Sequence, residues 1–136
     1  MRIPFIPILI AASTLCAACG VRFSDASGHN EFFRSLVVTG QTRTNTPLTV
    51  AVSYQTTYNV PVLIVCELRQ GKITVQEIGR NEVPAGHDGT PKAKPVPGNF
   101  SYDFEVEHPG SYRVQCYTER DADNYITRAF TVRQQQ

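Results

Sequence analysis

The segment from Glu119 to Asn124 gathers three carboxylates and one amide within a single predicted loop. Calcium takes oxygen ligands of this kind from protein loops. The spacing matches no complete calcium coordination pattern, and Asp and Asn are also the residues that ordinary turns favour. Calcium binding and a plain turn therefore both stay open for this acidic loop, and we assign no residue as a metal ligand.

Histidine is the side chain best suited to acid–base catalysis near neutral pH. The three histidines, His29, His87 and His108, are far apart in the sequence, and each falls in a predicted tether, loop or turn. The chain also has no Gly-x-Ser-x-Gly elbow, no phosphate-binding loop, no His-Glu-x-x-His and no paired zinc-type cysteines. We therefore expect no catalysis and no cofactor. A small hydrolase or metal-dependent enzyme with a dispersed site is the less favoured alternative.

Tyrosines flank two of the predicted loops. Tyr54 and Tyr58 flank the loop 55–59, and Tyr117 and Tyr125 flank the acidic loop. A tyrosine ring offers rigid contact area with a polar hydroxyl, which suits protein recognition. We predict that Tyr58, Tyr117 and Tyr125 contact a protein partner, although half-exposed tyrosines are also common near strand ends.

A second candidate for partner binding is the segment 84–98, PAGHDGTPKAKPVPG, which is rich in Pro and Gly. Connections of this length are uncommon in compact domains unless they are functional or mobile. Its Lys-Pro-Val-Pro portion is typical of polyproline II geometry. A partner-binding loop and a passive crossover between two sheets both stay open here.

The whole chain has 136 residues, of which 41% are hydrophobic and 18% charged, and its formal net charge is +1. This length and composition are typical of one compact domain. The 13 basic and 12 acidic residues are scattered along the sequence, so no basic patch indicates nucleic-acid binding.

The N-terminal segment differs in kind from the rest. A positive start at Arg2 precedes an almost wholly apolar stretch, 3–15, and small residues then precede Cys19. This layout is that of a signal peptide, and the apolar stretch is shorter than the ~20 residues that a membrane-spanning helix needs. We expect residues 1–18 to be removed on export.

The junction Leu15-Cys16-Ala17-Ala18-Cys19-Gly20 resembles the lipobox of bacterial lipoproteins, in which a small residue precedes a lipidated cysteine. The resemblance implies that Cys19 carries acyl chains, such as palmitate, at the mature N-terminus. Residues 19–30 would then be a tether and 31–136 the folded domain. Losing Arg2 leaves 12 basic and 12 acidic residues, so attachment to the membrane depends on the acyl chains. Ordinary signal cleavage and secretion is the alternative.

The lipoprotein interpretation gives each of the four cysteines a role and leaves no unpaired thiol in the mature chain. Cys16 leaves with the signal peptide, Cys19 takes the lipid, and Cys66 and Cys116 remain to pair. Export implies oxidising surroundings, which favour a disulfide over two buried free thiols. Closing a loop of about 50 residues contributes roughly 3–4 kcal/mol in the chain-entropy model.

Short runs of apolar and β-branched residues between turn residues predict an all-β domain. In the clearest run, Phe100, Tyr102, Phe104 and Val106 share one face and polar residues occupy the other. Seven such runs predict a two-sheet β-sandwich. Their predicted bounds are 31–38, 48–54, 62–69, 72–78, 100–107, 111–118 and 125–132.

The sequence NFSYDFEVEHPGSYRVQCYTE, followed by YITRAFTVR, resembles the last three strands of bacterial immunoglobulin-like and fibronectin-type-III-like domains. The resemblance implies that Cys66 and Cys116 lie on the third and sixth strands, as antiparallel neighbours in one sheet. Tyr112 lies four residues before Cys116, whereas the tyrosine corner of antibody domains lies two residues before.

Together these features predict a non-catalytic, lipid-anchored domain of the cell envelope that binds a protein partner or supports a complex. A secreted carbohydrate-binding or adhesion module is the alternative. Because strand direction reverses at each connection, the loops 55–59, 79–99 and 119–124 should gather at one end of the sandwich. The first strand should start at the same end, beside the tether.

Overall fold

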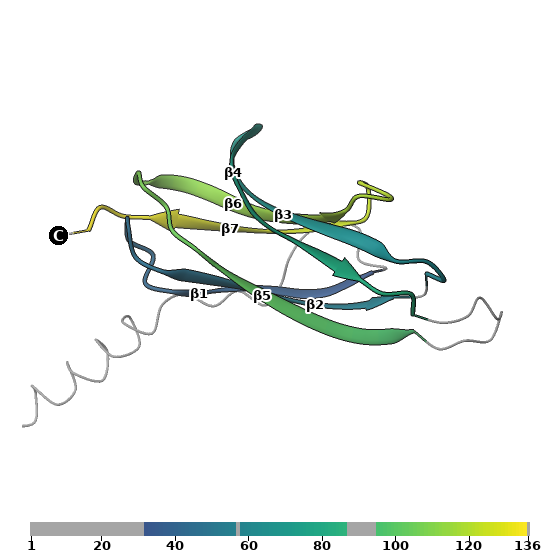
Figure 1. Cartoon of the computed structure of the whole chain (residues 1–136). Helices are drawn as coiled ribbons and strands as arrows, with labels where there is room; N and C mark the ends of the chain where they lie inside the picture. The colour runs from purple at the N-terminus through teal and green to yellow at the C-terminus, as the bar shows by residue number, and fades with distance from the viewer. Residues whose placement is uncertain (1–31, 57, 87–94, 136) are drawn as a thin grey trace, which may run out of the picture.

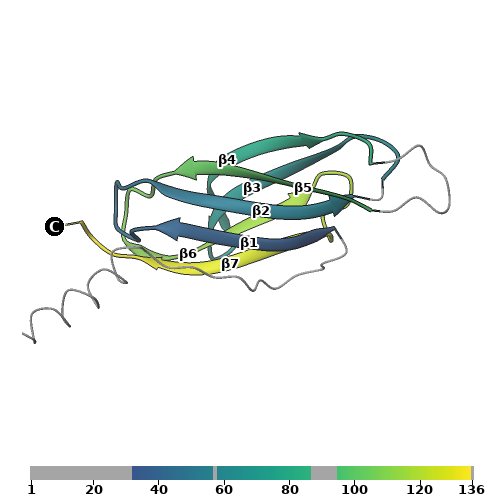
Figure 2. The same ribbon diagram turned by 90° about the horizontal axis from the view of Figure 1, so that it is seen from below.

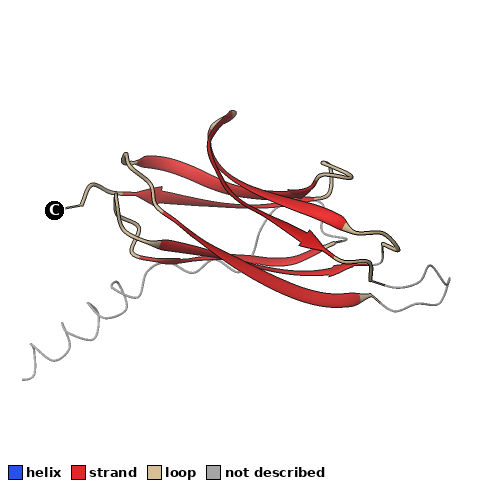
Figure 3. Ribbon diagram, viewed as in Figure 1, coloured by secondary structure: helices blue, strands red, loops and turns tan. Residues whose placement is uncertain are grey.

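The computed structural model describes residues 32–56, 58–86 and 95–135 of the chain. These residues form strands joined by turns and loops (Figure 3). No helix in these ranges has the length and apolarity that crossing a membrane requires. The strands are β1 (Phe33–Gly40), β2 (Leu48–Thr56), β3 (Val62–Gln70), β4 (Ile73–Val83), β5 (Val96–Phe104), β6 (Gly110–Thr118) and β7 (Tyr125–Val132).

The seven strands make two antiparallel sheets that pack face to face (Figures 1 and 2). One sheet has the order β1-β2-β5 and the other has the order β4-β3-β6-β7. The predicted all-β, seven-stranded immunoglobulin-like or fibronectin-III-like sandwich is therefore confirmed. The third and sixth strands are central neighbours, as the resemblance implied.

The core forms because each strand alternates apolar and polar side chains. In β2, Leu48, Val50 and Val52 are almost fully buried, while Ala51 between them is exposed. β3 differs because Val65, on its outer face, is also only 1% exposed. β3 is flanked by neighbouring strands on both sides, and its first residues, 62–65, are apolar on both faces.

The fourth strand is longer than the sequence predicts. It runs five residues beyond Ile78, through a polar stretch with low strand propensity, to Val83. Pairing with β3 holds this stretch in the sheet, and the ladder has register shifts at Cys66/Glu67 and at Leu68/Arg69. Bulges of this kind on an edge strand discourage pairing with another chain.

The fifth strand begins earlier and ends earlier than predicted. Val96 and Pro97 belong to β5 and pair with Thr56 and Gln55. The last residues of the predicted Pro-rich loop, 84–98, are therefore part of the sheet. Proline is tolerated because β5 is an edge strand, where one side of the backbone needs no partner. The strand ends at Phe104, and Val106 is buried without being part of it.

The predicted gathering of loops at one end is confirmed for the described residues. We call this the loop end, and define it as Phe32, 58–61, 84–86 and 119–124. Backbone hydrogen bonds tie it together: Gly86 N–H donates to the Tyr58 carbonyl at 2.9 Å, and Glu119 N–H donates to the Leu63 carbonyl at 2.9 Å. β1 starts at this end, and β7 finishes at the opposite, far end (Figure 2).

At the far end, Tyr112 lies near the start of β6 and its hydroxyl donates a hydrogen bond of 2.6 Å to the carbonyl of His108. This is the hydrogen bond of a tyrosine corner, in which a Tyr at the start of the sixth strand ties down the preceding turn. The spacing of four residues before Cys116 therefore serves the same purpose as the spacing of two in antibody domains.

Candidate recognition surfaces

The disulfide between Cys66 and Cys116 joins β3 to β6 inside the sandwich. The two residues are direct register partners, their Cα atoms are 4.1 Å apart, and both side chains are fully buried. The predicted pairing and its place between adjacent strands of one sheet are confirmed. A buried disulfide of this kind is typical of proteins in an oxidising, extracytoplasmic compartment.

Tyr58 lies at the loop end between the core and the acidic loop. Its ring centroid is 5.9 Å from that of Phe32, and the guanidinium of Arg120 lies 5.7 Å from the ring centroid on a cation–π contact. Its own N–H donates to the Thr56 hydroxyl at 3.1 Å. The side chain is half-buried and packs against the hydrophobic core. Tyr58 therefore both packs against the core and contacts the exposed Arg120.

Tyr117 and Tyr125 lie side by side on the outer face of the four-stranded sheet, as register partners of β6 and β7. Both are half-buried. The Tyr117 hydroxyl donates to the Glu67 carboxylate at 3.2 Å. The outward orientation predicted for this pair agrees with the structure, since their strand neighbours Cys116 and Ile126 are in the core.

Burial and the adjacent carboxylate of Glu67 together raise the pKa of Tyr117 above the ordinary value of 10.0. A hydroxyl that donates to a carboxylate resists deprotonation, because losing the proton would leave two negative charges in contact. Arg80 on β4 lies on the register row of Tyr117, with Val65 of β3 between them. It forms ion pairs with Glu77 at 3.0 Å and Glu119 at 3.5 Å. The Glu77 carboxylate raises the pKa of the Arg80 guanidinium.

No described contact joins Tyr58 to the pair formed by Tyr117 and Tyr125. The acidic loop lies between them, because Arg120 contacts Tyr58 while Glu119 pairs with Arg80, the cation on the outer-face row of Tyr117. Arg120 is the loop-end residue that the sequence did not single out. A lone Arg in an acidic segment gives no sign that it will lie over an aromatic ring.

The acidic loop is built as a turn. Asp121 Oδ1 accepts the N–H of Asp123 at 3.1 Å, and the Thr118 hydroxyl donates to the Asp121 carbonyl at 2.7 Å. Asn124 is buried, and its carbonyl accepts the N–H of Thr118 at 3.2 Å. Across the described ranges, no three His, Cys, Asp or Glu side chains come together as a metal site. The geometry favours the turn over the calcium site.

The loop end also carries a shallow hollow of about 390 Å³ next to Arg120. It is lined by the apolar residues Pro61, Val62 and Leu63 and by the charged residues Glu82, Glu119 and Arg120. A mixed surface of aliphatic, acidic and basic groups suits a protein partner.

Several predicted features lie outside the described residues. These are the signal peptide, Cys19 and its tether, His29, His87 and the middle of the Pro-rich segment, 87–94. His108 is described: it is exposed at the far end, and no other histidine in the described ranges lies near it.

Comparison with known proteins identifies no family. No family model matches the chain, and no curated protein matches it. Among solved structures, a β-glucosidase from Listeria innocua is similar over 83% of this chain, with 12% sequence identity and a TM-score of 0.46. The chain spans 16% of the length of that enzyme.

Proposed function

We propose that this protein is an exported, non-catalytic binding domain, anchored to a membrane of the cell envelope through lipid on Cys19. It presents the loop end to a protein partner. The buried Cys66–Cys116 disulfide supports the extracytoplasmic part of this proposal. The small-residue junction before Cys19 supports the anchor.

The single observation that carries the proposal is that β1 starts at the end where three loops gather. From Cys19 to Asn30 the chain spans at most about 40 Å when fully extended. A lipid on Cys19 would therefore hold the loop end close to the membrane surface. A membrane-embedded neighbour would meet Arg120 and the adjacent hollow first.

Intact mass spectrometry of the protein extracted from its native membrane tests the anchor. We expect a chain starting at Cys19 that carries two or three acyl chains, because one chain gives only marginal anchoring. A chain with an unmodified N-terminus, released without detergent, would contradict the anchor and would leave the binding proposal standing on its own.

Charge reversal at the loop end tests the binding surface. Arg120→Glu changes an exposed residue that touches Tyr58, and Lys72→Glu makes the matched change in the exposed hairpin of the far end. Each variant is cross-linked in intact envelopes, and the captured proteins are compared with those of the unchanged chain by mass spectrometry. We expect Arg120→Glu to lose a membrane protein that Lys72→Glu retains. Equal capture by both variants would place the partner elsewhere.

A further inference from the structure

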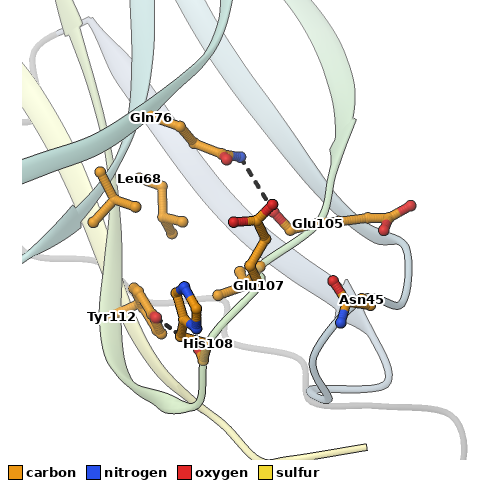
Figure 4. Close-up of a pocket in the computed structure, with 9 residues that line it drawn as sticks. Asn45, Leu68, Gln76, Glu105, Glu107, His108 and Tyr112 are labelled. Atoms are coloured by element: carbon orange, nitrogen blue, oxygen red, sulfur yellow. Dashed lines mark hydrogen bonds between the residues drawn. The ribbon is translucent and has the colours of Figure 1, made fainter.

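A cavity of about 420 Å³ opens at the far end, on the side where the edge strands β4 and β5 face each other. Its floor is apolar and consists of Leu68, Val106 and Tyr112, which are at most 5% exposed. Its rim is polar and includes Gln76 from β4 and the segment 105–108 that follows β5 (Figure 4). This volume lies at the small end of the range of about 300–1,000 Å³ that is usual for ligand pockets.

The rim is held in place from both sides. The Gln76 side-chain amide donates to the Glu105 carbonyl at 3.4 Å, and Tyr112 donates to the His108 carbonyl at 2.6 Å. Figure 4 shows the carboxylate of Glu107 and the ring of His108 standing between Gln76 and Tyr112. The cavity is therefore formed before any ligand arrives, which lowers the entropic cost of binding.

The rim carries negative charge without a counterion. Glu105 and Glu107 both line the cavity, and neither forms an ion pair within the described ranges. Among the residues that the structure describes, no lysine or arginine lines the cavity. Both residues are exposed to solvent, and Figure 4 shows the Glu107 carboxylate turned toward the cavity and that of Glu105 turned away, so Glu107 is the group placed to meet an incoming cation.

An apolar floor below an acidic rim matches one type of side chain. Lysine and arginine combine a hydrocarbon stem, which packs on apolar surface, with a charged head that donates to carboxylates. Val75, which also lines the cavity, is 46% exposed, so the polar rim is interrupted by an apolar side chain that a partner can reach. A partner residue next to the basic one would pack against this apolar side chain.

We propose that the far-end cavity binds a lysine or arginine side chain, flanked by apolar residues, of a protein partner. This site is separate from the loop end and does not depend on the anchor. Strands of about nine residues at roughly 3.3 Å per residue place the two ends about 30 Å apart. The domain would then contact one protein at each end.

Titration of the isotope-labelled full chain with short peptides tests the cavity, with amide chemical shifts as the measurement. The probes are acetyl-Val-Arg-Val-amide, its lysine counterpart and the neutral acetyl-Val-Gln-Val-amide. We expect the two basic peptides to shift the amides of Gln76, Val106 and Tyr112 in a saturable manner. The glutamine peptide should not shift them, because it lacks the charge.

Two variants make the test specific. Glu107→Gln removes the rim charge and should weaken binding of the arginine peptide about tenfold, because a charge-assisted hydrogen bond is lost. Glu82→Gln removes an exposed carboxylate of β4 that does not line this cavity, and it should leave the affinity unchanged. Equal binding of the neutral peptide, shifts confined to other residues, or unchanged affinity in Glu107→Gln would each overturn the proposal.

Discussion

The ring of Tyr102, on β5, lies directly against the backbone of Gly79, on β4 of the opposite sheet. A Cβ atom on Gly79 would come within 2.8–2.9 Å of three ring carbons. The Tyr102 hydroxyl also donates a hydrogen bond to the Arg80 carbonyl. One aromatic side chain therefore closes the side of the sandwich where the two edge strands face each other, and it requires glycine opposite.

Replacing Gly79 with alanine tests this contact. Alanine usually stabilises a strand interior relative to glycine, by about 0.5–1 kcal/mol. Here the added methyl group would displace the ring, and we expect a net loss of about 1–3 kcal/mol in the free energy of unfolding, measured in denaturant. In a Tyr102→Leu background the same change should cost much less. Additive effects of the two substitutions would show that the contact does not contribute.

Removing the disulfide should destabilise the domain strongly. In the Cys66→Ala/Cys116→Ala variant we expect a loss of roughly 3–4 kcal/mol from the loop-closure contribution alone. The loss is measured by denaturant unfolding against the oxidised chain. Alkylation of the unreduced native protein, followed by peptide mapping, is the control. Labelling of Cys66 or Cys116 in that sample would contradict the bond.

The tyrosine corner predicts a smaller effect with a different origin. Tyr112→Phe keeps the ring in the core but removes the donor to the His108 carbonyl. We expect a loss of about 1 kcal/mol in the free energy of unfolding, which is typical of one hydrogen bond. Tyr125→Phe is the matched control, because the structure shows no bond for that hydroxyl among the described residues. If the two variants lose the same stability, the corner bond contributes nothing.

Alkaline titration provides a test of the Tyr117–Glu67 contact. Burial and Glu67 raise the pKa of Tyr117 in the folded state, so the unfolded chain loses this proton first as the pH increases. The contribution to stability is complete below pH 10, the ordinary tyrosine value, and declines from there to the folded-state pKa. We expect Tyr117→Phe to reduce the fall in unfolding free energy over that window. An identical alkaline profile for the variant would refute the assignment.

The fold was predictable where local patterns agree with tertiary contacts. β2 and β6 alternate along their length and begin within a residue of the predicted positions, and β7 begins where it was predicted. The polar stretch from Gly79 to Val83 was missed because its strand conformation depends on pairing with β3 and on the space under Tyr102, which no local pattern encodes. The start of β5 was missed for the same reason. Only the topology reveals that β5 is an edge strand, where Pro97 is tolerated.

The candidate sites were harder to predict. The alternation of side chains along a strand predicted that Tyr117 and Tyr125 lie on the outer face. It could not show that the Tyr117 hydroxyl bonds to Glu67, fifty residues away. Tyr58 was expected to be a recognition residue, yet it also packs on Phe32, so its replacement by alanine would test folding and binding together. The far-end cavity is lined by both Gln76 of β4 and Glu107 of the segment between β5 and β6, which are 31 residues apart and come together only in the folded chain.

The direction of the strands has a mechanical consequence. β1 begins at the loop end and β7 finishes at the far end (Figure 2), so tension applied between these points runs along the strands. Ladders loaded in this way must break many hydrogen bonds together, whereas a hairpin pulled open at its turn breaks them one at a time. The Cys66–Cys116 bond also removes 50 residues of separation from the length that can be stretched, or about 170 Å of extended chain. A domain held at one end by a tether and at the other by a bound partner would therefore yield abruptly and extend little.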